Sequence, residues 1–282
     1  MDGIILVNKD SDMTSRDVVN ELTHTFHTKK IGHTGTLDPL ATGVLVLCIG
    51  KALKVAEYIT ALEKEYIAEI TLGINTDTLD ITGKVLEEKE VNISENEIDK
   101  VLSSFIGEYD MEVPIYSAVK VNGKRLYEYA RNNIEVELPI HKVNIYSIER
   151  ISNIENNKFM IKCKVSKGTY IRSLVRDICK RLNTIGVMSK LTRTKQGKFN
   201  IEDSYTLNEI KNGEYKLIPV IDYIDLPKIE VDESLLKKIK NGAKLENTFG
   251  YDMFCFIYNN EVIAIYQSNG LLVKPVKVLN NN

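Results

Sequence analysis

Asp38 is the residue best placed to do chemistry, because it lies inside a glycine-rich segment, residues 32–43 (GHTGTLDPLATG). The three glycines of this segment allow positive φ angles and let a ligand approach the backbone closely. Since a proline follows it, Asp38 is expected in an extended or turn conformation rather than in a helix. A carboxylate held on such a loop could act as a nucleophile or as a general base. Asp-Pro also starts many ordinary turns, so the spacing alone leaves both interpretations open.

Two other uses of glycine-rich loops do not fit this segment. A phosphate-binding loop of the Walker type needs Gly-Lys followed by Ser or Thr, and the segment contains no such run. Residues 32–35 match the Gly-x-x-Gly of a KH domain, but the strand-like run at residues 44–49 is not the helix that a KH loop requires. Neither a nucleotide-binding loop nor a KH domain is therefore predicted.

The charges of the chain nearly cancel but are unevenly distributed. The sequence has 37 Lys and Arg against 39 Asp and Glu, a net charge of −2. Residues 158–198 hold 12 basic residues and one acid, whereas residues 77–112 hold 11 acids and three lysines. Basic residues interleaved with tyrosines, as in residues 116–132, are typical of surfaces that bind phosphates and stack on bases. The pattern predicts a polyanionic partner, with solvated helix and strand faces as the alternative.

No metal site and no membrane segment are indicated. The four cysteines are widely spaced and lie among apolar neighbours, which predicts buried thiols in a reducing compartment. His24 and His27 are close together, but no cysteine or carboxylate motif accompanies them. The N-terminus has no secretory signal pattern, and the apolar run at residues 44–49 is too short to span a bilayer. We therefore expect a cytoplasmic protein without a metal.

Regular elements are expected on both sides of the Asp38 segment. Short apolar runs at residues 3–8 and 44–49 predict strands, and Ser15 is expected to cap a helix between them. Apolar and polar residues alternate over residues 64–72, which predicts a further strand. The Asp38 segment would run directly into the strand at residues 44–49.

The rest of the chain mixes helices and strands. A capping box at Ser94 predicts a helix whose apolar face includes Ile106. Helical spacing of apolar residues predicts another helix from about residue 169 to 182. After Pro227 the chain consists mostly of short strands. This order favours an α+β fold with a small β-rich C-terminal module over a βαβ alternation.

Residues 32–43 resemble the catalytic signature of the TruB family of tRNA pseudouridine-55 synthases. Further matches follow in order along the chain: residues 64–66 (KEY), 114–120 (PIYSAVK), 123–131 (GKRLYEYAR), 167–174 (KGTYIRSL) and 191–199 (LTRTKQGKF). Residues 241–242 and 270–275 are similar to parts of a PUA-type RNA-binding module. The resemblance extends over essentially all of the chain.

The resemblance implies roles for individual residues. The catalytic residues would be Asp38 as the nucleophile, Arg172 as its ionic partner, and Tyr66 as the residue that stacks on uracil and helps to remove its C5 proton. The substrate-binding residues would be His33, Tyr66, Tyr170 and Leu191, with His33 filling the space of the flipped nucleotide. RNA contacts would come from Lys9, Lys120, Lys124, Arg125, Arg131 and Arg193, and the basic segment at residues 158–198 would line the RNA cleft.

The implied fold is an α+β pseudouridine synthase fold with a central, mostly antiparallel sheet flanked by helices and a small β-rich, PUA-like C-terminal domain. The catalytic domain would comprise residues 1–227, with a thumb segment at about residues 116–142, and the PUA-like domain residues 228–282. The implied reaction converts uridine to pseudouridine at position 55 in the T-loop of tRNA, by base flipping and without a cofactor. The partner would be the T-arm of tRNA, with no obligate protein partner.

Two alternatives to a stand-alone enzyme are open. The first is an RNA-binding or tRNA-folding factor with a weak or vestigial catalytic site. The presence of Asp38, Tyr66 and Arg172 favours an enzyme, because a vestigial site would be expected to have lost one of them. The second is a guided pseudouridine synthase of a ribonucleoprotein, which the absence of long basic tails disfavours.

Overall fold

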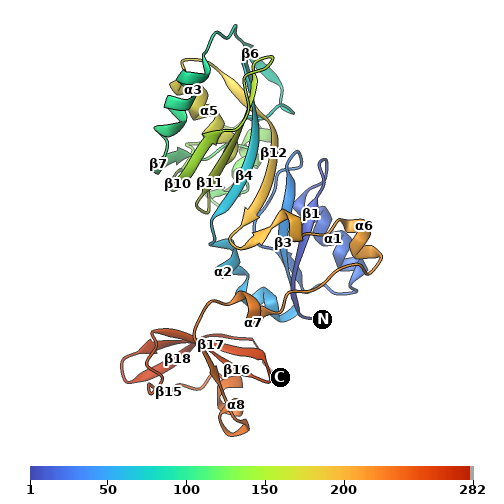
Figure 1. Cartoon of the computed structure of the whole chain (residues 1–282), viewed down its shortest axis with the longest axis vertical. Coiled ribbons are helices and arrows are strands. Elements are labelled where there is room, and N and C mark those ends of the chain that lie inside the picture. Colours follow the sequence, from blue (N-terminus) through green and yellow to red (C-terminus); the bar gives the residue numbers. More distant parts are fainter. Residues whose placement is uncertain (280–282) are drawn as a thin grey trace.

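The fold is built around one large sheet, seen in the upper part of Figure 1. The computed structural model describes residues 1–279. The strands of this sheet lie in the order β1-β3-β12-β4-β11-β10-β7, with β2 paired to β3 and β13 paired to β12. Their bounds are β1 Gly3–Lys9, β2 Ile31–His33, β3 Thr42–Ile49, β4 Lys64–Leu72, β7 Gly107–Glu112, β10 Ile140–Arg150, β11 Lys158–Val165, β12 Gly186–Gln196 and β13 Phe199–Asn200. Among these described strands only the β3–β12 pair is parallel, so the sheet is mostly antiparallel, as predicted.

Helices flank this sheet. The longer ones near it are α1 Ser15–Thr25, α3 Glu95–Ser103 and α5 Ile171–Arg181. In Figure 1, α3 and α5 lie on the same side of β4, β10 and β11. Leu174 and Val175 of α5 share one apolar core with Ala68 and Ile70 of β4. The predicted strand over β4 and the predicted helix at α5 are both confirmed.

The cap of the first helix lies one residue earlier than predicted, because α1 begins at Ser15 and Thr14 is its N-cap. The side chain of Thr14 accepts a hydrogen bond from the backbone N–H of Asp17, and the Asp17 carboxylate accepts one from the Thr14 N–H in return. Ser15 is buried in the first turn instead. The capping box predicted at Ser94 is confirmed, but Ile106 follows the end of α3 and is 55% exposed, so it does not belong to the apolar face of that helix.

A second sheet forms the C-terminal part of the chain, seen in the lower part of Figure 1. Its order is β14-β16-β17-β18-β15, with bounds β14 Lys228–Glu230, β15 Leu245–Glu246, β16 Met253–Tyr258, β17 Glu261–Asn269 and β18 Leu272–Val278, and it is accompanied by α8 Glu233–Lys240. Cys255 and Ile265 of this sheet share an apolar cluster with Ile4 and Val46 of the large sheet. One apolar cluster therefore connects the two parts of the chain, and the predicted domain division after residue 227 stays a prediction.

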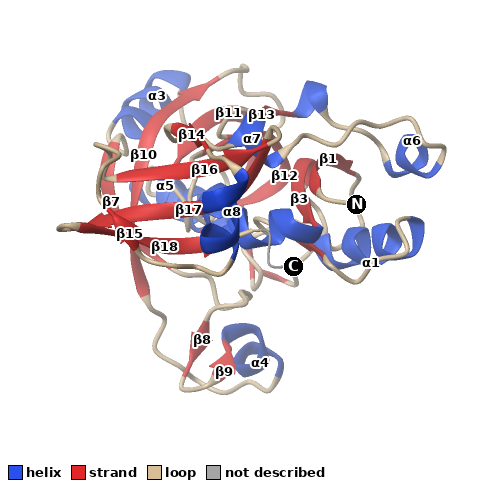
Figure 2. Ribbon diagram, turned by 90° about the horizontal axis from the view of Figure 1, so that it is seen from below, coloured by secondary structure: helices blue, strands red, loops and turns tan. Residues whose placement is uncertain are grey.

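A small projection stands apart from both sheets, as Figure 2 shows. It consists of β8 Lys120–Val121, β9 Lys124–Arg125 and α4 Leu126–Arg131. The remaining elements are η1 Gly50–Val55, α2 Ala56–Thr60, β5 Ile74–Thr76, β6 Val85–Glu88, η2 Ile201–Asp203, α6 Leu207–Lys211 and α7 Val220–Tyr223. The projection lies within the predicted thumb segment, whose last residues belong to β10 of the large sheet.

The four cysteines are buried and unpaired, as predicted. Within residues 1–279, none of the helices combines the length and the apolarity that a membrane crossing would require. The same part of the chain contains no group of three His, Cys, Asp or Glu side chains placed to hold a metal ion.

Candidate active site

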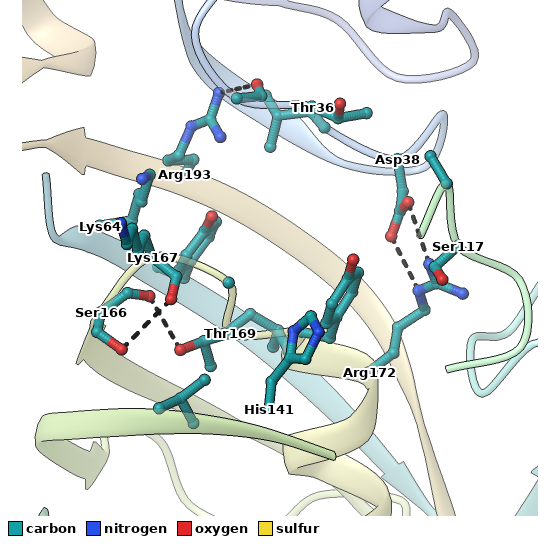
Figure 3. Close-up of a pocket in the computed structure, with 18 of the residues that line it drawn as sticks. Thr36, Asp38, Lys64, Ser117, His141, Ser166, Lys167, Thr169, Arg172 and Arg193 are labelled. Atoms are coloured by element: carbon teal, nitrogen blue, oxygen red, sulfur yellow. Dashed lines mark hydrogen bonds and ion pairs between the residues drawn. The ribbon is translucent and has the colours of Figure 1, made fainter. Parts of the chain in front are cut away.

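A cleft of about 750 Å³ brings together several of the predicted site residues. Its walls come from residues 34–38 of the glycine-rich segment, from β4 and β12, and from residues 166–172 at the start of α5. The root of the projection, residues 116–118, closes one side. Figure 3 shows that Asp38 and Arg172 point toward one another at one end, whereas Lys64 and Arg193 lie at the other end.

Asp38 and Arg172 form a two-pronged ion pair in this cleft. Nε of Arg172 lies 2.9 Å from Oδ2 of Asp38, and a terminal nitrogen donates to Oδ1 at 3.2 Å. The Arg172 side chain is only 6% exposed and the Asp38 side chain is 34% exposed. A planar guanidinium that meets both carboxylate oxygens fixes the direction of the carboxylate. Asp38 therefore presents its accessible side to the cleft in a defined orientation.

Backbone carbonyls hold Arg172 from two other segments. One of its terminal nitrogens donates to the carbonyl of Thr78 at 3.0 Å, and the other donates to the carbonyl of Tyr116 at 3.0 Å. The guanidinium is therefore bonded to the glycine-rich segment, to the turn after β5 and to the root of the projection at once. Both contacts use main-chain atoms, so no side-chain type in the sequence could have revealed them.

The loop that carries Asp38 is fastened from behind by Lys9. The Lys9 side chain is fully buried, and its ammonium donates to the carbonyls of Asp10, Met13 and Pro39 at 2.8, 2.7 and 3.3 Å. The prediction that Lys9 contacts RNA is therefore wrong: the ammonium is withdrawn from the surface and ties the residue after Asp38 to the end of β1. Burial lowers the pKa of Lys9 to about 8.

Tyr66, Tyr170 and Leu191 all line the cleft. Tyr66 is 8% exposed and Leu191 is 7% exposed, so each offers the cleft a small apolar patch. Burial raises the pKa of the Tyr66 phenol, while the neighbouring Arg193 acts in the opposite direction through its charge and a hydrogen bond. Two aromatic rings and an aliphatic side chain beside a carboxylate form a pocket suited to a planar base. Their individual roles stay predictions.

Arg193 lies on the floor of the cleft rather than on its surface. Its side chain is 1% exposed, Nε donates to the carbonyl of Val44 at 2.8 Å, and a terminal nitrogen donates to that of Gly35 at 3.1 Å. These two donors bind main-chain carbonyls of β3 and of the glycine-rich segment, while Arg193 also lines the cleft, so an RNA contact by Arg193 stays a prediction. The close approach also explains Gly43, which has a φ of +100° and where a Cβ atom would lie 2.3 Å from the Arg193 carbonyl.

His33 and the basic residues of the projection lie outside the cleft lining. His33 is half-buried, and desolvation followed by the charges of Arg16 and Arg193 lowers its pKa, which favours the neutral ring. The exposed predicted RNA-contact residues are Lys120, Lys124, Arg125 and Arg131. The Arg125 and Arg131 guanidinium groups lie 5.8 and 5.2 Å from the centre of the Tyr127 ring. These contacts organise a basic, aromatic surface, and RNA binding by it stays a prediction.

The basic segment at residues 158–198 does not line the cleft as a whole. In β11 and β4 the paired positions alternate between two faces, with Cys163 opposite Tyr66 on the cleft side. Lys162 and Lys164 point to the other face, where they lie 3.3 and 3.4 Å from Glu65 and Glu63. The part of the segment that reaches the cleft comprises Lys167, Arg172 and Arg193. The prediction is corrected accordingly: several of these lysines cover a solvated strand face.

Sequence reasoning gave no role to several polar side chains of the cleft, among them Lys64 and Ser117. Lys64 stands at the end of the cleft opposite Asp38, and it is the first residue of the Lys-x-Tyr motif that contains Tyr66. Ser117 lies beside the Asp38–Arg172 pair, and its side chain is buried. In both cases the signal was a polar residue inside a matched motif.

The fold and this site define a class of protein before any family is considered: an α+β protein with an arginine-held aspartate in a cleft that is partly lined by aromatic side chains. Residues 23–171 match the model of the TruB family pseudouridylate synthases, N-terminal domain. The chain therefore belongs to the TruB family of pseudouridylate synthases, and the family predicted from its motifs is confirmed.

Individual relatives cover nearly the whole chain. A protein named tRNA pseudouridine synthase B of Caldanaerobacter subterraneus is 45% identical over 97% of this chain and 94% of its own length. A protein of the same name from Staphylococcus saprophyticus is 46% identical over 99% of both chains. The crystal structure of a Cbf5-Nop10-Gar1 complex contains a chain with 25% identity and a TM-score of 0.74, over 99% of this chain and 85% of that one. The predicted pseudouridine synthase fold with a β-rich, PUA-like C-terminal part is thereby confirmed.

Proposed function

We propose that this protein converts uridine to pseudouridine at position 55 in the T-loop of tRNA, with Asp38 as the nucleophile. The observation that carries the proposal is the Asp38–Arg172 ion pair inside a cleft lined by Tyr66, Tyr170 and Leu191. The names of the relatives, tRNA pseudouridine synthase B, support tRNA as the substrate. The proposed site of action is the cytoplasm.

The chemistry matches what the cleft offers. The bond between C1′ and N1 of the nucleotide breaks, the detached uracil turns, a bond between C1′ and C5 forms, the C5 proton leaves and N1 gains a proton. No oxidant and no group donor enter this balance. Asp38, held by Arg172, stands where a carboxylate could attack the nucleotide, and the Tyr66 ring supports the base and lies ready to handle the C5 proton.

Access to the cleft requires that the target nucleotide leave the RNA stack. Flipping a base costs a few kcal/mol, which contacts with the protein must offset. The exposed basic residues of the projection, among them Lys124 and Arg131, are placed to hold phosphates while the base enters. His33 is proposed to fill the space of the flipped base.

Mass spectrometry of an unmodified tRNA transcript after incubation with the protein tests the proposal. The wild-type chain should produce one pseudouridine, in the T-loop, detected after chemical labelling and nuclease mapping. Asp38→Asn should abolish the product while tRNA affinity stays within about tenfold, since the amide keeps the shape but not the charge of the carboxylate. A product at another site would overturn the assigned position, and undiminished product from the variant would overturn the role of Asp38.

The alternative of a tRNA-folding factor with a vestigial site has no observation in its favour. The carboxylate, its arginine and both tyrosines are present and assembled in one cleft. We therefore propose the enzyme alone.

A further inference from the structure

Lys64 is a buried cation at the end of the cleft opposite Asp38. Its side chain is only 7% exposed and lines the cleft. Its ammonium donates to the carbonyls of Thr60 and Leu62, each at 2.7 Å. An ammonium has three donor protons, and within residues 1–279 these two carbonyls are its hydrogen-bond partners. One donor is therefore left for a ligand in the cleft.

The surroundings of Lys64 make this end of the cleft positive. The charges of Arg193 and Lys167 both act on the Lys64 ammonium and oppose its protonation. Glu63 is the acid that acts on it, and the Glu63 carboxylate is itself 3.4 Å from Lys164 on the other face of the sheet. In Figure 3, Lys64 and Arg193 stand together, away from the Asp38–Arg172 pair. A cleft floor with this excess of positive charge favours an anion.

An RNA substrate could offer this end of the cleft a phosphate or the detached base, and the depth of each cation in the cleft distinguishes between them. Lys64 and Arg193 are 7% and 1% exposed at the floor of the cleft, whereas Lys167 is exposed at its rim. A phosphate remains on the chain that runs outside the cleft, so the rim lysine is the one placed to meet it. The base is the part of the nucleotide that enters, so it is the part that can approach the floor.

We propose that Lys64 is a further catalytic residue, which hydrogen-bonds the detached uracil and, together with Arg193, stabilises its negative charge. The inference rests on the proposed function. When the C1′–N1 bond breaks, the electron pair stays with the base and spreads over its ring and carbonyl oxygens. The same pair then forms the bond from C5 to C1′, after which the C5 proton leaves. Donors fixed in a dry site stabilise such a charge without reorganisation.

The test compares two target bases in single-turnover reactions of tRNA with Lys64→Met, Lys64→Gln and the wild type. One tRNA carries uridine at the target position, and the other carries 5-fluorouridine, whose fluorine withdraws electrons and stabilises the detached base without help. With the fluorinated base the new bond can form but no C5 proton can leave, so loss of the starting nucleoside is measured for both. We expect Lys64→Met and Lys64→Gln to slow the uridine reaction about a hundredfold and the 5-fluorouridine reaction about tenfold or less.

Each other outcome has a definite meaning. Equal losses on the two bases in both variants would overturn the inference, because damage to the cleft would not distinguish the bases. A lower salt dependence of tRNA binding in Lys64→Met would also overturn it, in favour of a phosphate contact. A wild-type protein that forms no pseudouridine would refute the proposed function itself. Lys162→Met on the opposite strand face serves as the matched control and should react like the wild type with both bases.

Discussion

Ser15 and Leu37, far apart in the sequence, are joined by two hydrogen bonds between the Ser15 hydroxyl and the main-chain N–H and carbonyl of Leu37. The Leu37 N–H donates to Oγ of Ser15 at 2.8 Å, and Oγ lies 3.1 Å from the Leu37 carbonyl, to which it donates. Because Leu37 precedes Asp38, the start of α1 fixes the backbone that carries the proposed nucleophile. The neighbouring Thr14 caps the same helix and does not take part in these bonds.

This arrangement predicts different effects for two adjacent substitutions. Thr14→Ala should lower the free energy of unfolding by about 1 kcal/mol through loss of the cap, with little change in the rate of pseudouridine formation. Ser15→Ala should lower that rate by about tenfold or more, because the Leu37 peptide loses its buried partner and the Asp38 loop shifts. Thermal unfolding and single-turnover rates measure the two effects. The same pattern of losses in both variants would contradict the division of roles.

Arg172→Lys should lower the turnover rate by at least about a hundredfold. A lysine keeps the charge, but it cannot meet both oxygens of Asp38 and the carbonyls of Thr78 and Tyr116 at the same time. Affinity for tRNA, measured by filter binding, should change by less than about threefold. Arg176→Lys is the matched control, since Arg176 lies one turn further along α5 and pairs with Glu112. The turnover rate of Arg176→Lys should stay near that of the wild type. If Arg172→Lys also turned over at the wild-type rate, the Asp38–Arg172 ion pair would not be needed for the reaction.

Lys9→Met should reduce turnover without weakening the electrostatic part of tRNA binding. The buried ammonium holds the carbonyl of Pro39, so its loss frees the loop next to Asp38, whereas no phosphate can reach it. We expect the slope of log affinity against log salt to match that of the wild type. A flatter slope in Lys9→Met would return Lys9 to the set of RNA contacts.

Lys124→Ala, in contrast to Lys9→Met, should weaken tRNA binding, mainly at low salt, without reducing turnover. Lys124 is exposed in β9 of the projection and has no ion-pair partner within residues 1–279. Removing one phosphate contact should reduce the magnitude of the salt slope by about one, while the rate with saturating tRNA stays the same. An unchanged slope together with unchanged affinity would show that the projection does not hold the RNA at this residue.

The protonation of Lys64 predicts a fall in activity at alkaline pH. Burial, reinforced by the charges of Arg193 and Lys167 and opposed by that of Glu63, lowers the pKa of Lys64 from 10.5 to about 8. The single-turnover rate should therefore decrease as the pH rises through about 8. In Lys64→Arg the side chain should stay charged at these pH values, so the single-turnover rate of this variant should not fall. Since the pKa of Lys9 is also about 8, a decrease that persists in Lys64→Arg would assign it to Lys9 instead.

The same shift predicts the opposite trend for stability. Between pH 8 and 10.5 the unfolded chain still holds the Lys64 proton that the folded protein has released. The free energy of unfolding should therefore gain a contribution from Lys64 that increases with pH over this window. Denaturant unfolding of the wild type and of Lys64→Met at several pH values measures it, and a difference between the two that does not vary with pH would contradict the lowered pKa.

Much of the fold followed from local pattern. The strand over β4 was visible as an alternation, and the helix at α5 as an apolar stripe, because each depends on the spacing of neighbours along the chain. The resemblance to the family predicted that Asp38 and Arg172 form an ion pair. In the structure, Nε of Arg172 lies 2.9 Å from Oδ2 of Asp38. The order of the strands in the sheet needed pairings between distant segments, which local spacing does not encode.

The sequence by itself determined the elements, the family and the residue types that could do the chemistry. Only the tertiary structure decided which side of the sheet each cation faces and which acceptors it finds. Lys9 and Arg193 look like RNA contacts in the sequence, yet both are buried as donors to carbonyls of the Asp38 segment or its flanks. Lys162 lies on the solvated face of the sheet, where it pairs with Glu65, whereas Lys64 lines the cleft. Charge is a property of the residue, but burial and hydrogen bonding arise from the packing of segments that are remote in the chain.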